Sequence, residues 1–276
     1  MPRGGLATPA VVSLLFTDVC PPLVHGVGGH ELEEHLDAAR LDASVSSSEI
    51  RHDLGRSAIT PAPYVEHKLA LSPDADSVQA RFRPSVRRNI QIARRAGLVF
   101  RWAEEERDLT EKYYELHLAT RRRLGLPVQP HRFFCQLWQR MIDNKLGHVC
   151  LVHAGSKAIA GALFLRWKQT LMYKFGASDA RFWSLRANNL LFAETITWVC
   201  ENGVEHFHFG RGELEATSLH CFKLGRGAQQ SSLRYTMLAS ATPRVTALPM
   251  FARNAFRHSP RWVTRAVGEA LYRYTA

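Results

Sequence analysis

The chain has 276 residues and a formal net charge of +11, from 36 lysines and arginines against 25 aspartates and glutamates. Apolar residues make up 46% of the sequence, which excludes wholesale disorder and allows one large domain or two small ones. The basic excess predicts polyanionic partners: phosphates, nucleic acid or an anionic membrane surface. No apolar run approaches the roughly 18 residues needed to span a bilayer.

The N-terminus and the cysteines favour a cytoplasmic protein. A Thr-Asp pair follows the first apolar stretch, where a signal peptide would carry small residues and a cleavage site. The five cysteines are odd in number, widely spaced and without a C-x-x-C pair. We therefore expect a reducing compartment, no disulfide framework and no zinc site.

Patterning predicts short elements in the first quarter of the chain. A strand is expected over 11–16, a short helix over 30–41 and a half-buried strand over 64–71. Residues 44–63 are weakly patterned, so strands are expected only at the margins of this segment.

Most of the charge lies in two local patches, and the first is a helix expected over 85–96. It begins after Pro84 and ends before Gly97. One face is apolar, and the other presents arginines with no carboxylate between them: Arg87, Arg88, Arg94 and Arg95. A solvated surface helix is the plain alternative. We favour a phosphate-binding face, because unscreened arginines repel one another until an anion binds.

The rest of the chain predicts helices that cover a largely antiparallel sheet, an α+β pattern. Three strands in its middle are joined by turns short enough for tight hairpins. The expected order is a strand over 98–103, helices over 109–123 and 131–145, strands over 149–153, 158–167 and 170–176, a helix over 188–202, and strands over 204–209 and 232–238.

The second basic patch lies at the C-terminus. Ser259 and Pro260 are typical of a helix start. The residues after them form an apolar stripe with arginines beside it: Trp262, Val263, Ala266, Val267, Ala270, Leu271 and Tyr274. Two interpretations stay open. The helix lies on an anionic membrane surface at the inner face of the membrane, or it caps the core of the protein itself.

The order of elements resembles the GNAT fold of acyl-CoA N-acyltransferases, and several strings resemble the Fem family of peptidoglycan-bridge aminoacyltransferases. The strings are SLLFTDVCPPL at 13–23, YVEHKLALS at 64–72, RPSVRRNIQIARRAG at 83–97, YKFGASDARFWSLRANNLLFAETITWVCENG at 173–203, FHFGRGE at 207–213 and FKLGRGA at 222–228. The resemblance implies a GNAT-like acyltransferase domain over 76–240. A partial GNAT-like lobe over 1–75 would precede it, and a basic amphipathic tail over 241–276 would follow.

The resemblance also implies N-acyl transfer without a metal. The donor would be acyl-CoA or aminoacyl-tRNA, and the acceptor an amine on a phosphorylated or lipid-linked precursor of the cell envelope or of a polysaccharide. Phe222 and Lys223 match a functionally important pair of the family. Lys223 would neutralise a substrate phosphate or the oxyanion, with Arg211 in support. The residues expected to bind donor or acceptor are Asp18, Tyr173, Arg186, Asn188, Asn189 and the four arginines of the helix over 85–96.

The sequence departs from the family pattern in three places. His208 stands where the family usually has an acidic residue, and residues 185–188 replace the glycine-rich pyrophosphate loop of GNAT enzymes. The first GNAT-like half begins late, so we expect it to be incomplete. An alternative therefore stays open: a catalytically degraded Fem-like module that binds phosphate, an anionic membrane or RNA such as tRNA. His206, His208 and His220 are expected to be ordinary histidines, since further ligands at metal-site spacing are missing.

Overall fold

The computed structural model describes the chain apart from residues 1–9, 14–16, 56–58, 240–249 and 272–276. The strand expected over 11–16 therefore falls partly outside the described residues, and so does Tyr274. None of the described helices is long and apolar enough to cross a bilayer.

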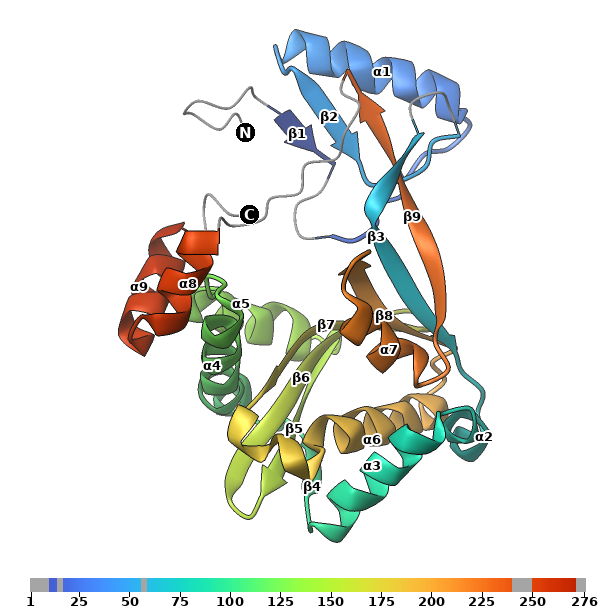
Figure 1. Cartoon of the computed structure of the whole chain (residues 1–276). Coiled ribbons are helices and arrows are strands. Elements are labelled where there is room, and N and C mark those ends of the chain that lie inside the picture. The colour runs from blue at the N-terminus through green and yellow to red at the C-terminus, as the bar shows by residue number, and fades with distance from the viewer. Residues whose placement is uncertain (1–9, 14–16, 56–58, 240–249, 272–276) are drawn as a thin grey trace.

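One mixed sheet organises the described residues (Figure 1). Its strands lie in the order β1-β2-β9-β3-β8-β7-β6-β5-β4. Only β1 with β2 and β7 with β8 pair in parallel, which confirms the expected mixed, largely antiparallel sheet. The strands are β1 (Ala10–Val12), β2 (Ser47–Ile50), β3 (Ile59–Ala70), β4 (Val99–Trp102), β5 (Gly147–Ala154), β6 (Lys157–Trp167), β7 (Thr170–Ser178), β8 (His206–Glu213) and β9 (Gln229–Leu238).

Strand β3 comes from the N-terminal part of the chain but pairs with two strands from the C-terminal part. It lies between β8 and β9, and it pairs antiparallel with both. Strands from residues 1–75 and from residues 76–240 therefore belong to the same sheet. In Figure 1, β3 and β9 form a long twisted ribbon that reaches up to β2 and α1 (Gly29–Asp42). Helix α1 is held there by Leu32 and Leu36, which pack against Ile50 and Leu238.

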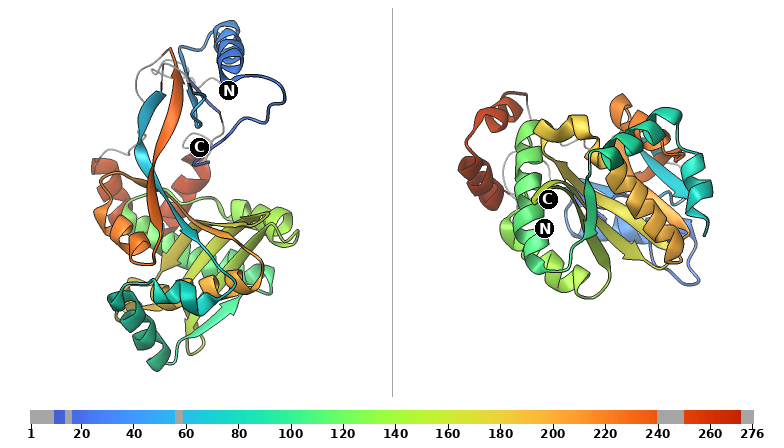
Figure 2. Two further views of the ribbon diagram at one scale, coloured as in Figure 1. Left: turned by 90° about the vertical axis from the view of Figure 1, so that its right-hand side faces the viewer. Right: turned by 90° about the horizontal axis from the view of Figure 1, so that it is seen from below.

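Helices cover both faces of the lower part of the sheet, so the sheet lies between two helical layers (Figure 2). Helices α3 (Pro84–Arg95) and α6 (Ala187–Glu201) cover one face. The other face carries a π-helical turn (Asp108–Tyr113) that continues into α4 (Tyr114–Leu124), and α5 (His131–Leu137) that continues into a second π-helical turn (Trp138–Ile142).

The two cores follow from the period-two pattern of the strands. Along β5, Cys150 and Val152 point into the core under α3 and α6, whereas Val149 and Leu151 point into the core under α4 and α5. Both helix pairs therefore bury an apolar stripe against one continuous sheet.

Four elements were not expected from the sequence: α2 (Ala75–Ala80), a 3₁₀ turn (Ala180–Leu185), α7 (Thr217–Leu224) and α8 (Met250–His258). The expected C-terminal helix is α9 (Arg261–Leu271), which begins directly after Pro260. Helices α8 and α9 both pack against α4 (Figure 1). The C-terminal helix thus covers the folded domain with one of its faces, as one of the two interpretations predicts.

Candidate active site

The parallel neighbours β7 and β8 separate part-way along their length. Their pairing covers only Thr170–Met172 with His206–His208, although both strands run on beyond it. A register shift between β6 and β7 lies at the same level, between the pairs Phe164–Tyr173 and Leu163–Phe175. The separated strands form a split in the sheet, close to Tyr173, which is one of the predicted binding residues.

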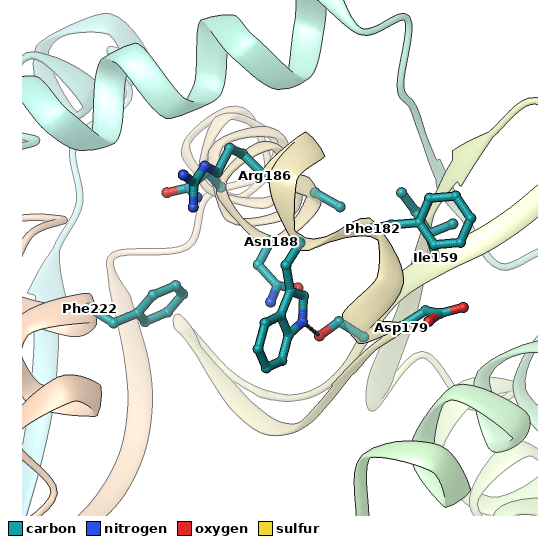
Figure 3. A pocket seen from close by; sticks show the side chains of 10 residues that line it. Ile159, Asp179, Phe182, Arg186, Asn188 and Phe222 are labelled. Atoms are coloured by element: carbon teal, nitrogen blue, oxygen red, sulfur yellow. Dashed lines mark hydrogen bonds between the residues drawn. The ribbon is translucent and has the colours of Figure 1, made fainter. Parts of the chain in front are cut away.

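A cavity of about 250 Å³ opens at the C-terminal end of β7 and the N-terminus of α6 (Figure 3). It brings together Phe222 and three of the predicted binding residues. Its lining residues are Ile159, Ser178, Asp179, Phe182, Trp183, Arg186, Ala187, Asn188, Asn189 and Phe222. The cavity therefore joins an aromatic wall to polar side chains at a helix start.

The N-terminus of α6 is suited to an anion. Arg186 occupies the N-cap position in the left-handed region, at φ 58°, and no side chain caps the helix. The first backbone N–H groups of a helix lack partners inside the helix, and its dipole favours negative charge there. Because the Asn189 N–H already donates to the Arg186 carbonyl at 2.8 Å, a phosphate in the cavity would meet the N–H groups of Ala187 and Asn188, together with the side chains of Arg186, Asn188 and Asn189.

Arg226, which the sequence did not single out, holds two walls of the cavity in place. Its side chain is 1% exposed, and its guanidinium lies 3.6 Å from the centre of the Phe222 ring. It donates to the Asn189 side-chain oxygen at 2.9 Å and to the Phe222 carbonyl at 2.7 Å. Burial lowers the pKa of Arg226 to about 9, with Tyr173 acting in the opposite direction. Its place in the FKLGRGA string was the signal that could have found it.

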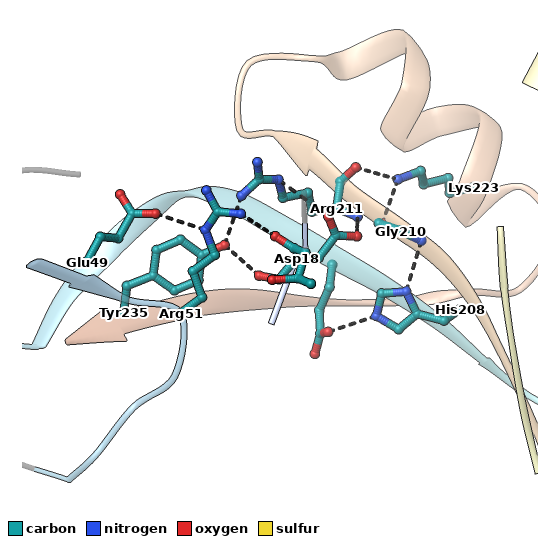
Figure 4. Close-up of polar contacts among 10 residues, drawn as sticks. Asp18, Glu49, Arg51, His208, Gly210, Arg211, Lys223 and Tyr235 are labelled. Atoms are coloured by element: carbon teal, nitrogen blue, oxygen red, sulfur yellow. Dashed lines mark hydrogen bonds and ion pairs between the residues drawn. The ribbon is translucent and has the colours of Figure 1, made fainter. Parts of the chain in front are cut away.

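Lys223 points away from the cavity toward β8, although Phe222 beside it in sequence lines the cavity (Figure 4). Its ammonium donates to the carbonyls of Gly210 at 2.9 Å and Arg211 at 3.4 Å. The side chain is 1% exposed, and burial lowers the pKa of Lys223 to about 8, while the charge of Asp18 raises it. Lys223 thus fixes the β8 backbone beside the split and places a positive charge there.

Gly210 is the point where β8 turns at the split. Its φ is 70°, a region in which glycine carries no Cβ penalty. A Cβ on this residue would lie 3.2 Å from the Tyr173 carbonyl and 3.5 Å from a carboxylate oxygen of Asp18. The absence of a side chain therefore leaves room for the Tyr173 carbonyl, whereas the distance to Asp18 is that of an ordinary van der Waals contact.

Asp18 and Arg211, both predicted site residues, meet on the other side of β8 (Figure 4). The Asp18 carboxylate accepts the Arg211 backbone N–H at 3.0 Å, and its second oxygen lies 3.5 Å from the Arg211 Nε. Tyr235 donates to the Asp18 carbonyl at 2.7 Å and accepts from the Arg211 guanidinium at 3.1 Å. The segment around Asp18 is thereby tied to β8 and β9.

His208, which stands where the family usually has an acid, is paired with an acid from another strand. Its Nε2 lies 2.9 Å from the Glu66 carboxylate, and its Nδ1 accepts the Gly210 N–H at 2.9 Å. The hydrogen bond from His208 lowers the pKa of Glu66 to about 2, against the opposing effect of burial and with help from Lys68. A negative charge is therefore present beside β8, and β3 supplies it.

The arginines of α3 lie away from the cavity. All four are exposed, and Arg94 forms an ion pair with Glu194 of α6 at 2.9 Å. Arg87 donates to the Ala80 carbonyl at the end of α2, at 2.7 Å. The expectation that no carboxylate screens this face is wrong for Arg94, because the acid comes from a different helix.

Tyr173 lies at the split, but its ring is buried against Phe164 and Phe192. Burial raises its pKa, so the hydroxyl stays protonated. Its carbonyl, beside Gly210, is the part that borders the split. Among the described residues, no group of three or more His, Cys, Asp or Glu side chains is arranged to hold a metal ion.

The acetyltransferase (GNAT) domain family matches residues 80–229, more than half of the chain. The chain belongs to this family. The split between β7 and β8 and the start of α6 lie inside the matched segment of the GNAT domain, as does the Phe222–Lys223 pair. The match confirms the expected GNAT family and the acyltransferase class of enzyme. A search of curated proteins finds no match.

Solved structures with the same fold include FemX, with a TM-score of 0.59 and 14% identity over 76% of this chain and 77% of that one. The C-terminal domain of a putative lysylphosphatidylglycerol synthetase from Agrobacterium fabrum has a TM-score of 0.56 and 11% identity, over 88% and 77% of the two chains. For L-PGS from Bacillus licheniformis the TM-score is 0.53 and the identity 12%, over 83% and 77%. The expected Fem-like fold is thus confirmed.

Proposed function

We propose that this GNAT domain transfers an acyl or aminoacyl group from a thioester of coenzyme A or an ester of tRNA to an amine. The acceptor would be a phosphorylated or lipid-linked precursor of the cell envelope or of a polysaccharide. One observation carries the proposal: the cavity at the start of α6 lies at the end of β7, directly beyond the split between β7 and β8.

Both candidate donors carry phosphate groups: in coenzyme A the pantetheine arm separates them from the thioester, and in aminoacyl-tRNA the terminal nucleotide bears a phosphate. A donor phosphate would bind at the N-terminus of α6, with Arg186, Asn188 and Asn189 around it. The apolar part of the donor would lie against Phe222. From there the acyl carbonyl would reach the split beyond Met172 and His208, where backbone N–H groups of the separated strands would stabilise an oxyanion.

The reaction needs alignment more than side-chain chemistry. A neutral amine attacks the acyl carbon, the new C–N bond forms, and the C–S or C–O bond to the carrier breaks. The amine proton leaves with the carrier or to solvent. The Asp18 carboxylate, close to Gly210, would attract the incoming amine, and the buried Lys223 charge would stabilise negative charge that develops at the split.

The choice of acceptor is supported by the name of one structural relative. It is the C-terminal domain of a putative lysylphosphatidylglycerol synthetase, and lysylphosphatidylglycerol is a lipid that carries an amino acid. A lipid-linked acceptor also agrees with the basic C-terminal segment of this chain. Between residues 250 and 271 the sequence has four arginines and only one carboxylate.

A thermal-shift screen of acyl-CoA thioesters and aminoacyl-tRNA identifies the donor, because a ligand that binds only the native state raises its melting temperature. We expect one of the two classes to stabilise the protein and Arg186→Ala to weaken that effect. The alternative of a degraded binding module predicts that neither class does so.

The role of Lys223 is tested by measuring the rate of acyl transfer with the donor that the thermal-shift screen identifies. We expect Lys223→Ala to lower kcat by about a hundredfold, the magnitude usual for loss of an oxyanion-stabilising group. Lys223→Arg keeps the charge and serves as the matched variant. Circular dichroism confirms that each variant is folded. Full activity in a correctly folded Lys223→Ala protein would remove Lys223 from the proposal.

A further inference from the structure

The C-terminal helices α8 and α9 are fixed to the domain through their inner faces. Arg122 of α4 donates to the Ser259 carbonyl, between the two helices, at 2.6 Å. Gly268 packs so closely on the Val128 carbonyl that a Cβ would collide with it. Because both helices lie against α4, their other faces share the outer side of the molecule (Figure 1).

Large apolar side chains stand on this outer side. Met250 is 66% exposed, Phe251 78% and Trp262 72%, although each belongs to a helix that is otherwise anchored. Exposed single apolar residues are common, but three of this size within 13 residues mark an interaction surface.

The charge on the same side is positive. Arg257 is exposed on α8, whereas the exposed Arg261 and Arg265 reach back to α4, where Arg261 pairs with Glu115 at 3.1 Å and Arg265 lies 5.7 Å from the centre of the Tyr114 ring. Glu269 is the one carboxylate between residues 250 and 271, and it turns inward to accept the His131 backbone N–H at 3.2 Å. Between residues 250 and 271, the outer face of the two helices therefore presents Arg257 and large apolar side chains, with Arg261 and Arg265 at its border with α4 and no carboxylate of its own.

We propose that the outer face of α8 and α9 docks on an anionic lipid bilayer. Trp262, Phe251 and Met250 enter the interface between headgroups and acyl chains, and Arg257 contacts a lipid phosphate. A bilayer fits better than RNA, because methionine has no ring on which a base can stack, and the exposed aromatic residues stand on short helices outside any groove.

Sedimentation of the full chain with vesicles tests the surface. We expect binding to vesicles of phosphatidylcholine mixed with phosphatidylglycerol, and little binding to phosphatidylcholine alone. Trp262→Ala should weaken binding by about tenfold or more, and Arg257→Gln by about fivefold. Trp167→Ala is the matched control, because Trp167 is equally exposed, at 70%, but belongs to the β6–β7 hairpin.

Two outcomes overturn the proposal. One is that the protein does not bind anionic vesicles even at low salt. The other is that Trp262→Ala and Trp167→Ala bind them equally well. A gel shift with tRNA accompanies the experiment, and loss of tRNA binding in Trp262→Ala without loss of vesicle binding would assign the surface to RNA. The donor-induced thermal shift should be the same in Trp262→Ala as in the wild type, so this test is independent of the proposed function.

Discussion

Arg226 is fully buried, and it forms no ion pair with a carboxylate of the described residues. Its hydrogen bonds go to Asn189 and Phe222, and its charge lies against two aromatic rings. A buried cation without an ion-pair partner is costly to keep, so its replacement by an apolar side chain of similar length is often tolerated by the fold. We infer that Arg226 is retained because it positions the cavity.

This role predicts a separation between stability and donor binding. In Arg226→Met, the free energy of unfolding should change by no more than about 2 kcal/mol, because the lost hydrogen bonds are offset by removal of a buried charge. Donor affinity should fall by about tenfold as Asn189 and Phe222 loosen. Urea denaturation and the donor-induced thermal shift measure the two effects. An unchanged donor shift would contradict the role, and Arg234→Met, at an exposed position, is the control.

The sequence predicts those site residues that lie close together along the chain. Arg186, Asn188 and Asn189 form one helix start, so a motif at 173–203 was enough to group them. The pairing of Glu66 with His208 spans 142 positions and joins two strands that are distant in sequence. Neither residue carries a local signal for the other, so only the strand order shows where the missing acid comes from.

Among the elements, those with clear boundary residues were predicted closely. Helix α3 was expected over 85–96 and occupies Pro84–Arg95, because Pro84 and Gly97 mark its ends. Helix α7 was missed, since it has eight residues and no side-chain cap. The π-helical turns next to α4 and α5 were also missed, because their apolar spacing is close to that of an ordinary helix.

The contact of α9 with the domain predicts whether Gly268→Ala stabilises or destabilises the protein. In an exposed helix, Gly→Ala stabilises by up to about 1 kcal/mol, because alanine is the better helix former. Gly268→Ala should instead destabilise the protein by about 1–3 kcal/mol, because its Cβ would collide with the Val128 carbonyl. Thermal melting and limited proteolysis between residues 240 and 260 measure the effect. A rise in melting temperature would show that α9 does not rest on this loop.

For the molecule as a whole, buried neutral histidines make stability depend on pH. Burial lowers the pKa of His117 to about 4, and burial together with the charge of Lys223 lowers that of His67 to about 4. In the unfolded chain both return to about 6.5 and bind protons that the native state does not. The native state is therefore favoured above pH 6.5 and loses stability as the pH falls from 6.5 toward 4.

Near pH 5 the expected slope is up to about 1.4 kcal/mol per pH unit for each of these histidines. Urea denaturation at pH 7.5, 6 and 5 measures it. His117→Gln should reduce the slope, since the amide keeps a hydrogen bond to Gln129 but does not titrate in this range. Equal slopes for the variant and the wild type would exclude His117 as a source. Glu66 acts in a separate, more acidic range, between its unfolded pKa and about 2.

The position of β3 between β8 and β9 has a consequence for how the protein is made. On the ribosome β3 emerges early, whereas both of its partners are synthesised well over a hundred residues later. Until then its backbone hydrogen-bonding groups have no strand beside them, and such an unpaired strand is prone to wrong pairing. A fragment cut at the boundaries of the GNAT family match, residues 80–229, would lack β3 and nearly all of β9 and would expose the edge of β8. Expression of the GNAT domain in folded form therefore depends on β3 and β9, which lie outside or almost outside the family match.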